Sequence, residues 1–494
     1  MTASPPHPPG SVEARLRAAL AERAAGRLLT AARMIDALLP QAPGHPAVWH
    51  TAALIAREMG QPVKASDAVG RALALAPGHA TLLQLAARLR LDRGLPAVEA
   101  FDRAIKAAPA DPNARRGRAA ALLAAEGPAA AEAELVAAAA ALADDPGIHA
   151  DLASLRLQMG AGDSFDAGFA AAVAARPDSP DLWRIWVAVT ADSPFRSRVP
   201  ALIARARAAV GDQPGFALVE AAARSDAGEH DAAEALLSAP PLATDPDAVV
   251  TAVRHLIRTG RLAGAAAAAE AGLHGRHAFA LWPYLATLWR VLGDPRADWL
   301  DEEPSLVRVW DLAPLLPDLA AIADHLRGLH RMKAAPPDQS VRGGTQTDGH
   351  LLLRDDPPIR RLRAAIEQVV AAHIAQLGPE DARHPTLAGP RGPFRFTGSW
   401  SVRLRDAGFH IPHTHSQGWL SSALYLALPD APARQGWLKL GEPPADLGLD
   451  LRPTRWIEPA PGRLVLFPST MWHGTEPFDA GERLTVAFDV VPLL

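Results

Sequence analysis

The stretch WHTAALIAREMGQPVKASDAVGRALALAP, residues 49–77, shows most directly how the first half of the chain folds. Two helix-like segments are separated by Gly60, and the small residues Ala53 and Ala65 stand where the two helices would touch. Small side chains let antiparallel helices approach closely, and a proline such as Pro77 stops a helix because it has no backbone N–H. The stretch therefore predicts a helix–turn–helix unit that ends near Pro77.

This unit recurs along the chain. Prolines that follow helix-like stretches are separated by 34, 32, 37, 34, 34 and 32 residues, and glycines lie near the expected turns of later units. These residues are Pro43, Pro77, Pro109, Pro146, Pro180, Pro214 and Pro246, with Gly127, Gly160, Gly228 and Gly260. A period near 34 is typical of a helical solenoid and resembles the tetratricopeptide repeat. We therefore predict tetratricopeptide-like repeats over residues 11–274, with a generic helical bundle as the alternative. Stacked repeats offer a concave groove for a protein or peptide.

Composition excludes several classes of protein. A chain of 494 residues is expected to form about two to four domains. The net charge of −4 indicates neither a nucleic-acid partner nor an anionic membrane. With no cysteine there can be no disulfide, thiolate metal site or cysteine nucleophile. The start MTASPPHPPGSVEARLRAAL has no signal-peptide pattern, and no apolar run is long enough to span a membrane, so we expect a cytoplasmic protein. Its oligomeric state stays open.

Beyond the repeats the pattern changes twice. Residues 275–335 contain four tryptophans in helix-like sequence, and we predict a helical transition or capping segment, with an aromatic binding surface as the alternative. Pro357–Leu377 is predicted to be an amphipathic helix. Short runs that alternate between apolar and polar residues follow. We predict strands at Phe394–Leu404, Trp419–Leu428, Gly436–Leu440, Arg463–Phe467 and Arg483–Val491. Helices first and strands last indicate a multi-domain α + β protein with a C-terminal jelly roll.

The candidate chemistry lies in the last hundred residues. His413 and His415 are two positions apart, so on an extended chain both imidazoles would face one cation. His473 follows 58 residues after His415 and could complete a set of ligands that leaves open positions, which suits Fe(II). Ten residues further on, Arg483 could bind a carboxylate through its two-pronged guanidinium, and Thr485 would face the same way.

The stretches that carry this pattern resemble a bacterial branch of the 2-oxoglutarate/Fe(II) oxygenases, which often carries N-terminal tetratricopeptide repeats. They are RGGTQT, GSWSVRL, HTHSQGWLSSALYLALP, GRLVLFPSTMWHG and ERLTVAFDV. The resemblance covers residues 336–494 and implies a double-stranded β-helix. It also implies that Fe(II), 2-oxoglutarate and O₂ take part, with His413 and His473 as iron ligands and Arg483 on the far carboxylate of 2-oxoglutarate.

One position departs from that family. Most members have a carboxylate two residues after the first histidine, where this chain has His415. His415 could be a third neutral ligand, or it could lie outside the ligand shell. Asp406 and Asp430 are too distant along the chain to replace it. A spacing of three residues should turn His410 to the opposite face. Tyr425 could hydrogen-bond the cosubstrate or simply pack in the core.

Three functions remain open from the sequence. The first is an Fe(II)- and 2-oxoglutarate-dependent dioxygenase that hydroxylates a protein or peptide recruited by the repeats. The second is a three-histidine iron dioxygenase that does not use 2-oxoglutarate. The third is a repeat scaffold without catalytic activity. Because ligand histidines must be neutral, activity is expected to fall below about pH 6.5 if these histidines titrate normally.

Overall fold

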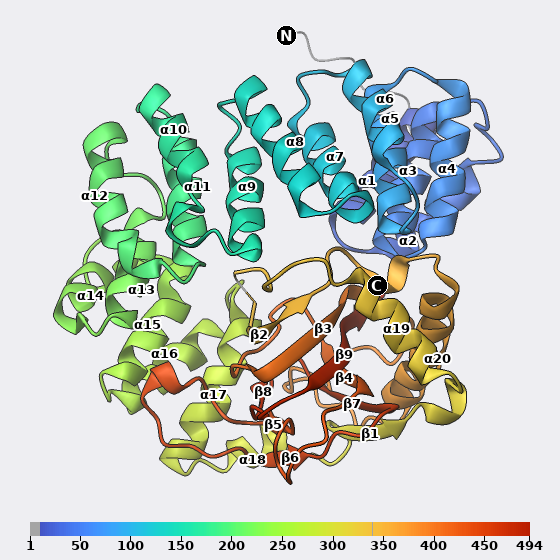
Figure 1. Ribbon diagram of the computed structural model, residues 1–494. Helices are drawn as coiled ribbons and strands as arrows, with labels where there is room; N and C mark the ends of the chain where they lie inside the picture. The colour runs from blue at the N-terminus through green and yellow to red at the C-terminus, as the bar shows by residue number, and fades with distance from the viewer. Residues whose placement is uncertain (1–9, 338) are drawn as a thin grey trace.

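The computed structural model describes residues 10–337 and 339–494, and it places helices first and strands last, as predicted (Figure 1). The first nine residues, part of the stretch searched for a signal peptide, lie outside the described residues. The α-helices that precede the first strand are α1 (Val12–Ala24), α2 (Leu28–Leu38), α3 (Pro46–Glu58), α4 (Pro62–Leu75), α5 (Ala80–Asp92), α6 (Val98–Ala107), α7 (Pro112–Ala125), α8 (Pro128–Ala141), α9 (Pro146–Met159), α10 (Ala167–Ala175), α11 (Pro180–Ala191), α12 (Val199–Val210), α13 (Phe216–Asp226), α14 (His230–Leu237), α15 (Val249–Arg258), α16 (Leu262–Gly272), α17 (Ala278–Leu292) and α18 (Arg296–Asp301).

These helices form a solenoid of antiparallel pairs, which confirms the predicted repeats. The predicted turn glycines lie between the paired helices with left-handed backbone, as at Gly60 with φ 72° and Gly260 with φ 72°. The prolines have two roles instead of one. Pro77 follows α4 as predicted, but Pro146 and Pro180 are the first residues of α9 and α11. Proline suits that position because the first helical N–H has no partner within the helix.

The C-terminal region contains two antiparallel sheets, as expected for the predicted jelly roll. The larger sheet has the order β1-β7-β4-β9-β3-β2, and the smaller has the order β6-β5-β8. The strands are β1 (Arg308–Asp311), β2 (Val341–Gln346), β3 (Phe394–His410), β4 (Leu420–Ala427), β5 (Leu438–Leu440), β6 (Arg455–Ile457), β7 (Arg463–Pro468), β8 (His473–Thr475) and β9 (Glu482–Pro492). All five predicted strands are present, with shifted ends.

Two helices cover the outer face of the larger sheet. These are α19 (Leu319–Leu329) and α20 (Pro357–Ala375), and the predicted apolar face of α20 is buried. On β9, Leu484, Val486 and Phe488 pack in this core. Successive strand residues point to opposite faces. Arg483 and Thr485 therefore face the interior between the two sheets, where the larger sheet positions the candidate site.

The segment 275–335 differs from the predicted all-helical one. Its tryptophans pack as expected, since Trp289 is buried against α16 and Trp282 lies against it. However, β1 pairs with β7 at the edge of the larger sheet, and α19 belongs to the core of that sheet. A four-residue strand is hard to recognise from sequence because alternation over so few residues is weak. The C-terminal domain thus takes structural elements from before residue 336.

The solenoid curves around the C-terminal domain (Figure 1). The edge that carries the turns within helix pairs makes the contacts. The carbonyl oxygen of Gly60 accepts a hydrogen bond from Arg363 at 2.9 Å, and Arg93 forms an ion pair with Asp355. Further along, the carbonyl oxygen of Gln158 accepts hydrogen bonds from the backbone of residues 333 and 334. The two parts are therefore joined along much of the solenoid and not only through the connecting segment.

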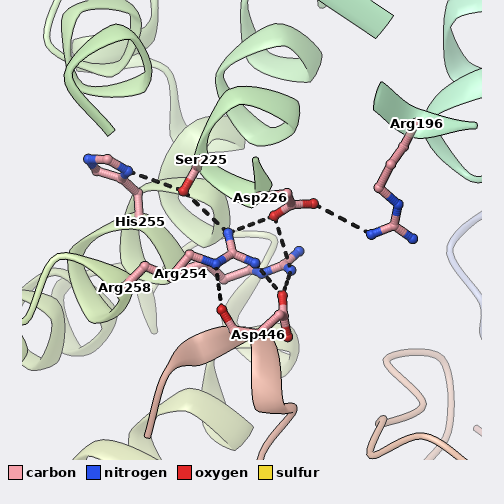
Figure 2. Close-up of polar contacts among 7 residues, drawn as sticks. All are labelled: Arg196, Ser225, Asp226, Arg254, His255, Arg258 and Asp446. Atoms are coloured by element: carbon pink, nitrogen blue, oxygen red, sulfur yellow. Dashed lines mark hydrogen bonds and ion pairs between the residues drawn. The ribbon is translucent and has the colours of Figure 1, made fainter. Parts of the chain in front are cut away.

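The far end of the solenoid is held by a charged cluster (Figure 2). Asp446, in the loop between β5 and β6, accepts a hydrogen bond from Arg254 at 2.9 Å and forms an ion pair with Arg258. Asp226 on α13 binds Arg258 from the other side at 2.7 Å, and Arg196 lies 3.6 Å from Asp226. Nearby, the indole N–H of Trp472 donates to the carbonyl oxygen of Pro283 in α17 at 2.9 Å. These contacts attach the last repeats to the residue that precedes His473.

None of the helices in the described part of the chain has both the length and the apolar character needed to cross a membrane.

Candidate metal centre

Three histidines that are far apart in sequence meet between the two sheets. His413 and His473 face each other in an isolated antiparallel bridge, and their ring centroids are 4.1 Å apart. The ring of His415 lies 5.0 Å from that of His413 and 4.9 Å from that of His473. One nitrogen from each ring can be chosen so that all three lie within 4.8 Å of one another. Three nitrogen donors at this spacing could hold one metal ion.

The hydrogen bonds of His413 and His473 fix which ring nitrogen carries the proton. Nδ1 of His413 lies 2.9 Å from the carbonyl oxygen of Ile411, and Nδ1 of His473 lies 3.1 Å from the carbonyl oxygen of Met471. A carbonyl oxygen can only accept, so Nδ1 carries the proton in both rings. The lone pair is then on Nε2 of each histidine. Both rings are in the tautomer that a metal requires.

The third ring is oriented by a carboxylate. Nδ1 of His415 lies 2.7 Å from Oδ1 of Asp489, which also accepts a hydrogen bond from the Ser421 hydroxyl at 2.6 Å. Ser421 in turn lies 2.8 Å from Ser469. A carboxylate behind a histidine fixes its tautomer and makes the other nitrogen a stronger donor. A carboxylate is thus present behind His415, although not at the position where the resembling family has its ligand carboxylate.

Sequence reasoning missed Asp489, although a signal was available. It considered only the nearby Asp406 and Asp430. Asp489 is four residues after Thr485 on the same strand, and an even spacing puts both on one face. Counting alternate positions along β9 would have brought Asp489 into the site together with Arg483.

His410 is outside the cluster of possible metal ligands, as predicted, but the prediction that it faces away from the site was wrong. This residue lines the same pocket as the three clustered histidines, and its ring centroid lies 5.9 Å from that of His413. The hydroxyl of Ser340 connects the two rings, at 2.9 Å from Nδ1 of His410 and 3.1 Å from Nε2 of His413. Face counting fails here because β3 ends at His410 and the chain turns before His413. A spacing of three residues predicts opposite faces only within an unbroken strand.

Burial keeps His413 and His473 neutral. It lowers the pKa of His413 to about 3, and neighbouring His415 acts in the same direction. Burial also lowers the pKa of His473 well below its ordinary value, with His413 as the next cause. A group with a lowered pKa stays unprotonated until the pH falls to that value. The expected loss of activity near pH 6.5 therefore needs correction, because His413 remains able to donate its lone pair far below that pH.

Arg483 lies in the same pocket as a buried cation without a counter-ion. Its side chain is 2% exposed, and among the described residues no carboxylate lies within ion-pair distance of it. Its guanidinium carbon stands 5.0 Å from the centroid of the Tyr425 ring. Nε of Arg483 and the hydroxyl of Tyr425 have no hydrogen-bond partner in the described part of the chain.

This arrangement requires an anion from outside. Burial lowers the pKa of Arg483, yet a guanidinium stays charged at neutral pH. A buried charge without a partner is unfavourable by several kcal/mol, in order of magnitude. A carboxylate that entered the pocket would pair with it, and Thr485, which is 4% exposed and also lines the pocket, offers a hydroxyl donor nearby. The donor set therefore fits a divalent metal and a carboxylate ligand side by side.

The structure brings together the residues selected from the sequence. His413, His415, His473, Arg483 and Thr485 all line one pocket. Tyr425 is fully buried against Arg483 and packs in the interior core, as one of its two expected roles required, whereas a hydrogen bond to the cosubstrate stays a prediction. Direct metal ligation by each histidine stays a prediction.

Comparisons with known proteins separate the two halves of the chain. A thermophilic TPR protein of Thermus thermophilus is 22% identical, with a TM-score of 0.29, and the match covers 36% of this chain and 98% of that one. A tetratricopeptide repeat protein of Parabacteroides merdae is 16% identical, with a TM-score of 0.31, over 46% of this chain and 91% of that one. Because these TM-scores are low, the assignment of the repeats rests on the helix pairs described above and not on these two structures.

Among curated proteins, no sequence matches this chain. The segment that contains the three histidines and Arg483 does match a family model. Residues 398–489 of the C-terminal domain match the family described as "Putative 2OG-Fe(II) oxygenase".

Proposed function

We propose that the C-terminal domain is a dioxygenase that uses Fe(II) and 2-oxoglutarate to hydroxylate a protein or peptide substrate. The observation that carries the proposal is Arg483, a buried guanidinium without a counter-ion in the pocket of the three histidines. A dicarboxylate cosubstrate would satisfy both features at once, since one carboxylate can pair with Arg483 while the other end reaches the metal.

In this proposal Nε2 of His413, His415 and His473 would hold the iron. Bound iron and 2-oxoglutarate supply the oxidising power, since decarboxylation of the cosubstrate to succinate and CO₂ is coupled to the oxidation of a C–H bond by O₂. The protein itself orients the metal ligands and the cosubstrate and excludes water from the pocket. Asp489 holds the His415 ring, Arg483 fixes the cosubstrate, and the surrounding aromatic rings of Phe467 and Trp400 keep water away.

Turnover of the cosubstrate tests the proposal without a known substrate. Purified protein with Fe(II) and ascorbate should slowly convert 2-oxoglutarate to succinate, which NMR can follow. Arg483→Ala should lower this conversion at least about 100-fold, because a buried charge-assisted pair is lost. Arg405→Ala removes an exposed arginine from the neighbouring strand β3 and should leave the rate within about twofold. Equal rates in both variants would contradict the role of Arg483.

The second candidate is a three-histidine dioxygenase that does not use 2-oxoglutarate. The observation in its favour is His415, which makes the cluster an all-nitrogen set. Under this alternative the protein binds iron but neither binds nor consumes 2-oxoglutarate. Titration of 2-oxoglutarate into the Fe(II)-loaded protein under nitrogen, followed by the visible absorption of the iron, separates the two.

A further inference from the structure

A large cleft lies away from the metal pocket, where the repeats meet the C-terminal domain. It has a volume of about 1080 Å³. One wall is formed by the ends of α5 and α7 and the start of α6, and the other by residues 347–354 of the oxygenase domain. We call it the junction cleft. Its volume is slightly above the usual range of about 300–1,000 Å³ for small-ligand sites.

The junction cleft is rigid at one end. The Arg93–Asp355 ion pair crosses from the α5–α6 turn to the oxygenase domain, and the backbone N–H of Asp355 donates to the carbonyl oxygen of Arg93 at 2.9 Å. Beside it, the guanidinium of Arg354 lies so close to Gly94 that a Cβ there would stand 2.7 Å from it. Because these contacts fix the two walls relative to each other, the cleft is a built feature of the fold and not a gap between independent domains.

The lining combines small apolar residues with arginines. Alanines from α6 and α7 leave the floor open, and Leu91 and Leu329 add larger apolar contacts. Five arginines and three acidic residues complete the lining: Arg88, Arg90, Arg103, Arg331 and Arg354, against Asp92, Glu99 and Asp348. The carboxylate of Asp92 is already bound by Arg57 at 3.1 Å and by Arg88 at 2.8 Å. The lining is therefore net positive in a chain whose total charge is −4.

The free positive charges come from separate elements. Arg103 lies on α6 and Arg331 follows α19, both are exposed, and neither has an ion pair within the described residues. Charges spread across both walls suit a ligand with several negative groups along its length better than a single small anion. An extended peptide with acidic side chains has that form, and its smaller residues would fit the alanine floor.

The junction cleft also adjoins the metal pocket along the chain. Gln346, the last residue of β2, lines the metal pocket, and Thr347 lines the cleft. Thr347 is fixed to β3, since its hydroxyl accepts a hydrogen bond from the backbone N–H of Ser401 at 2.9 Å. A chain that occupied the cleft and continued past the end of β2 would reach the rim of the metal pocket beside Trp400.

We propose that the junction cleft binds an extended, acidic segment of the protein substrate and so presents a neighbouring residue to the metal pocket. This assignment of substrate class rests on the proposed function, whereas the binding site itself does not depend on catalysis.

Direct binding tests the proposal on the full-length protein without iron or 2-oxoglutarate. The probe is a fluorescein-labelled peptide of alternating glutamate and alanine, and fluorescence anisotropy reports its binding. Peptides with lysine or serine in place of glutamate serve as comparisons. The double variant R103E/R331E reverses two charges of the cleft, and R17E/R71E makes the same change in charge at exposed arginines on α1 and α4, outside the cleft lining. Thermal melts show that each variant is folded.

The acidic peptide should bind at least about tenfold more tightly than the lysine and serine peptides, and R103E/R331E should weaken it by a similar factor. R17E/R71E should change it less than about twofold. Hydrogen exchange should slow in residues 347–354 and at the start of α6 when the peptide is added. Equal losses in both double variants, or no preference for the acidic peptide, would overturn the proposal. If the peptide binds as described while the wild-type protein fails to consume 2-oxoglutarate, only the proposed function fails.

Discussion

The repeats and the C-terminal domain are stabilised in different ways. The solenoid is divided into successive small cores, each built from helices that are neighbours in sequence. The C-terminal domain has one large core that joins α20 to strands as distant as β9, more than a hundred residues further along the chain. Local contacts make a repeat stack additive, whereas a sheet core of distant strands is lost as a unit. A catalytic pocket needs the second kind, because its donors must be held to fractions of an ångström.

The largest expected difference between the two regions comes from removing the same type of side chain from the core of each. Phe488 is fully buried in the sheet core, and Phe101 is 1% exposed in the small core around α6. Phenylalanine to alanine costs about 3–5 kcal/mol in either place. We expect Phe488→Ala to unfold the whole oxygenase domain at a lower temperature and to abolish metal binding. Phe101→Ala should mainly speed hydrogen exchange in α5–α7. If hydrogen exchange became faster over regions of similar extent in both variants, the two regions would not differ in cooperativity.

A second prediction concerns how the stability of the segment that joins the two regions depends on pH. Burial raises the pKa of Asp301, at the end of α18, to about 7, with Arg290 opposing the change. Because the folded-state pKa exceeds the unfolded value, this group contributes stability that is complete below about pH 4 and lost as the pH rises through 7.

The unfolding temperature of the wild-type protein should therefore fall between pH 5 and pH 8. The size of the effect follows from the pKa difference between the folded and unfolded states, since each pKa unit corresponds to about 1.4 kcal/mol of stability. Asp301→Asn should remove most of this dependence, while Asp298→Asn, three residues earlier on the same helix, should retain it. Differential scanning calorimetry at the two pH values measures the effect. An Asp301→Asn protein with the same slope as wild type would show that another group is responsible.

A third prediction tests how far the metal centre depends on long-range contacts. Asp489→Asn removes the carboxylate behind His415, a pair separated by 74 residues in the chain. Loss of such a partner usually lowers metal affinity about 10–100-fold. Isothermal titration with Co(II), whose visible spectrum also reports the ligand geometry, measures this directly. Asp479→Asn, at an exposed loop position, is the matched control. Unchanged affinity in Asp489→Asn would place His415 outside the ligand shell.

The smallest expected effect is at the interface itself. Asp446→Asn weakens the ion pairs with Arg254 and Arg258, and the carboxylate is 46% exposed. Partly exposed pairs of this kind contribute up to about 1 kcal/mol. We expect little change in the unfolding temperature but faster hydrogen exchange in the β5–β6 loop and in α15. If exchange in both segments stays the same, the charged cluster does not hold the two regions together.

The same difference explains what the sequence could predict. Gly60 and the period near 34 predicted the helix pairs because each pair is a local unit. The predicted apolar face of Pro357–Leu377 was also confirmed, since amphipathic periodicity needs no partner to be recognised. The three-residue strands β6 and β8 were not predicted, because they form only where distant strands pair with them. The place of His410 in the pocket could not be predicted because it depends on where β3 ends. Asp489 could have been predicted from its even spacing to Thr485 on β9, but its contact with His415 depends on how distant strands align.

The contact between Trp472 and α17 has a practical consequence for dissecting this protein. The indole N–H bonds to Pro283 and Thr287, and its ring meets Tyr284 edge-on at 5.5 Å. A recombinant fragment that started at residue 336 would lose these partners together with strand β1. It would expose the indole of Trp472, one residue from His473, to solvent. The shortest fragment with an intact histidine pocket must therefore begin upstream of α17, so that it includes α17 and α18.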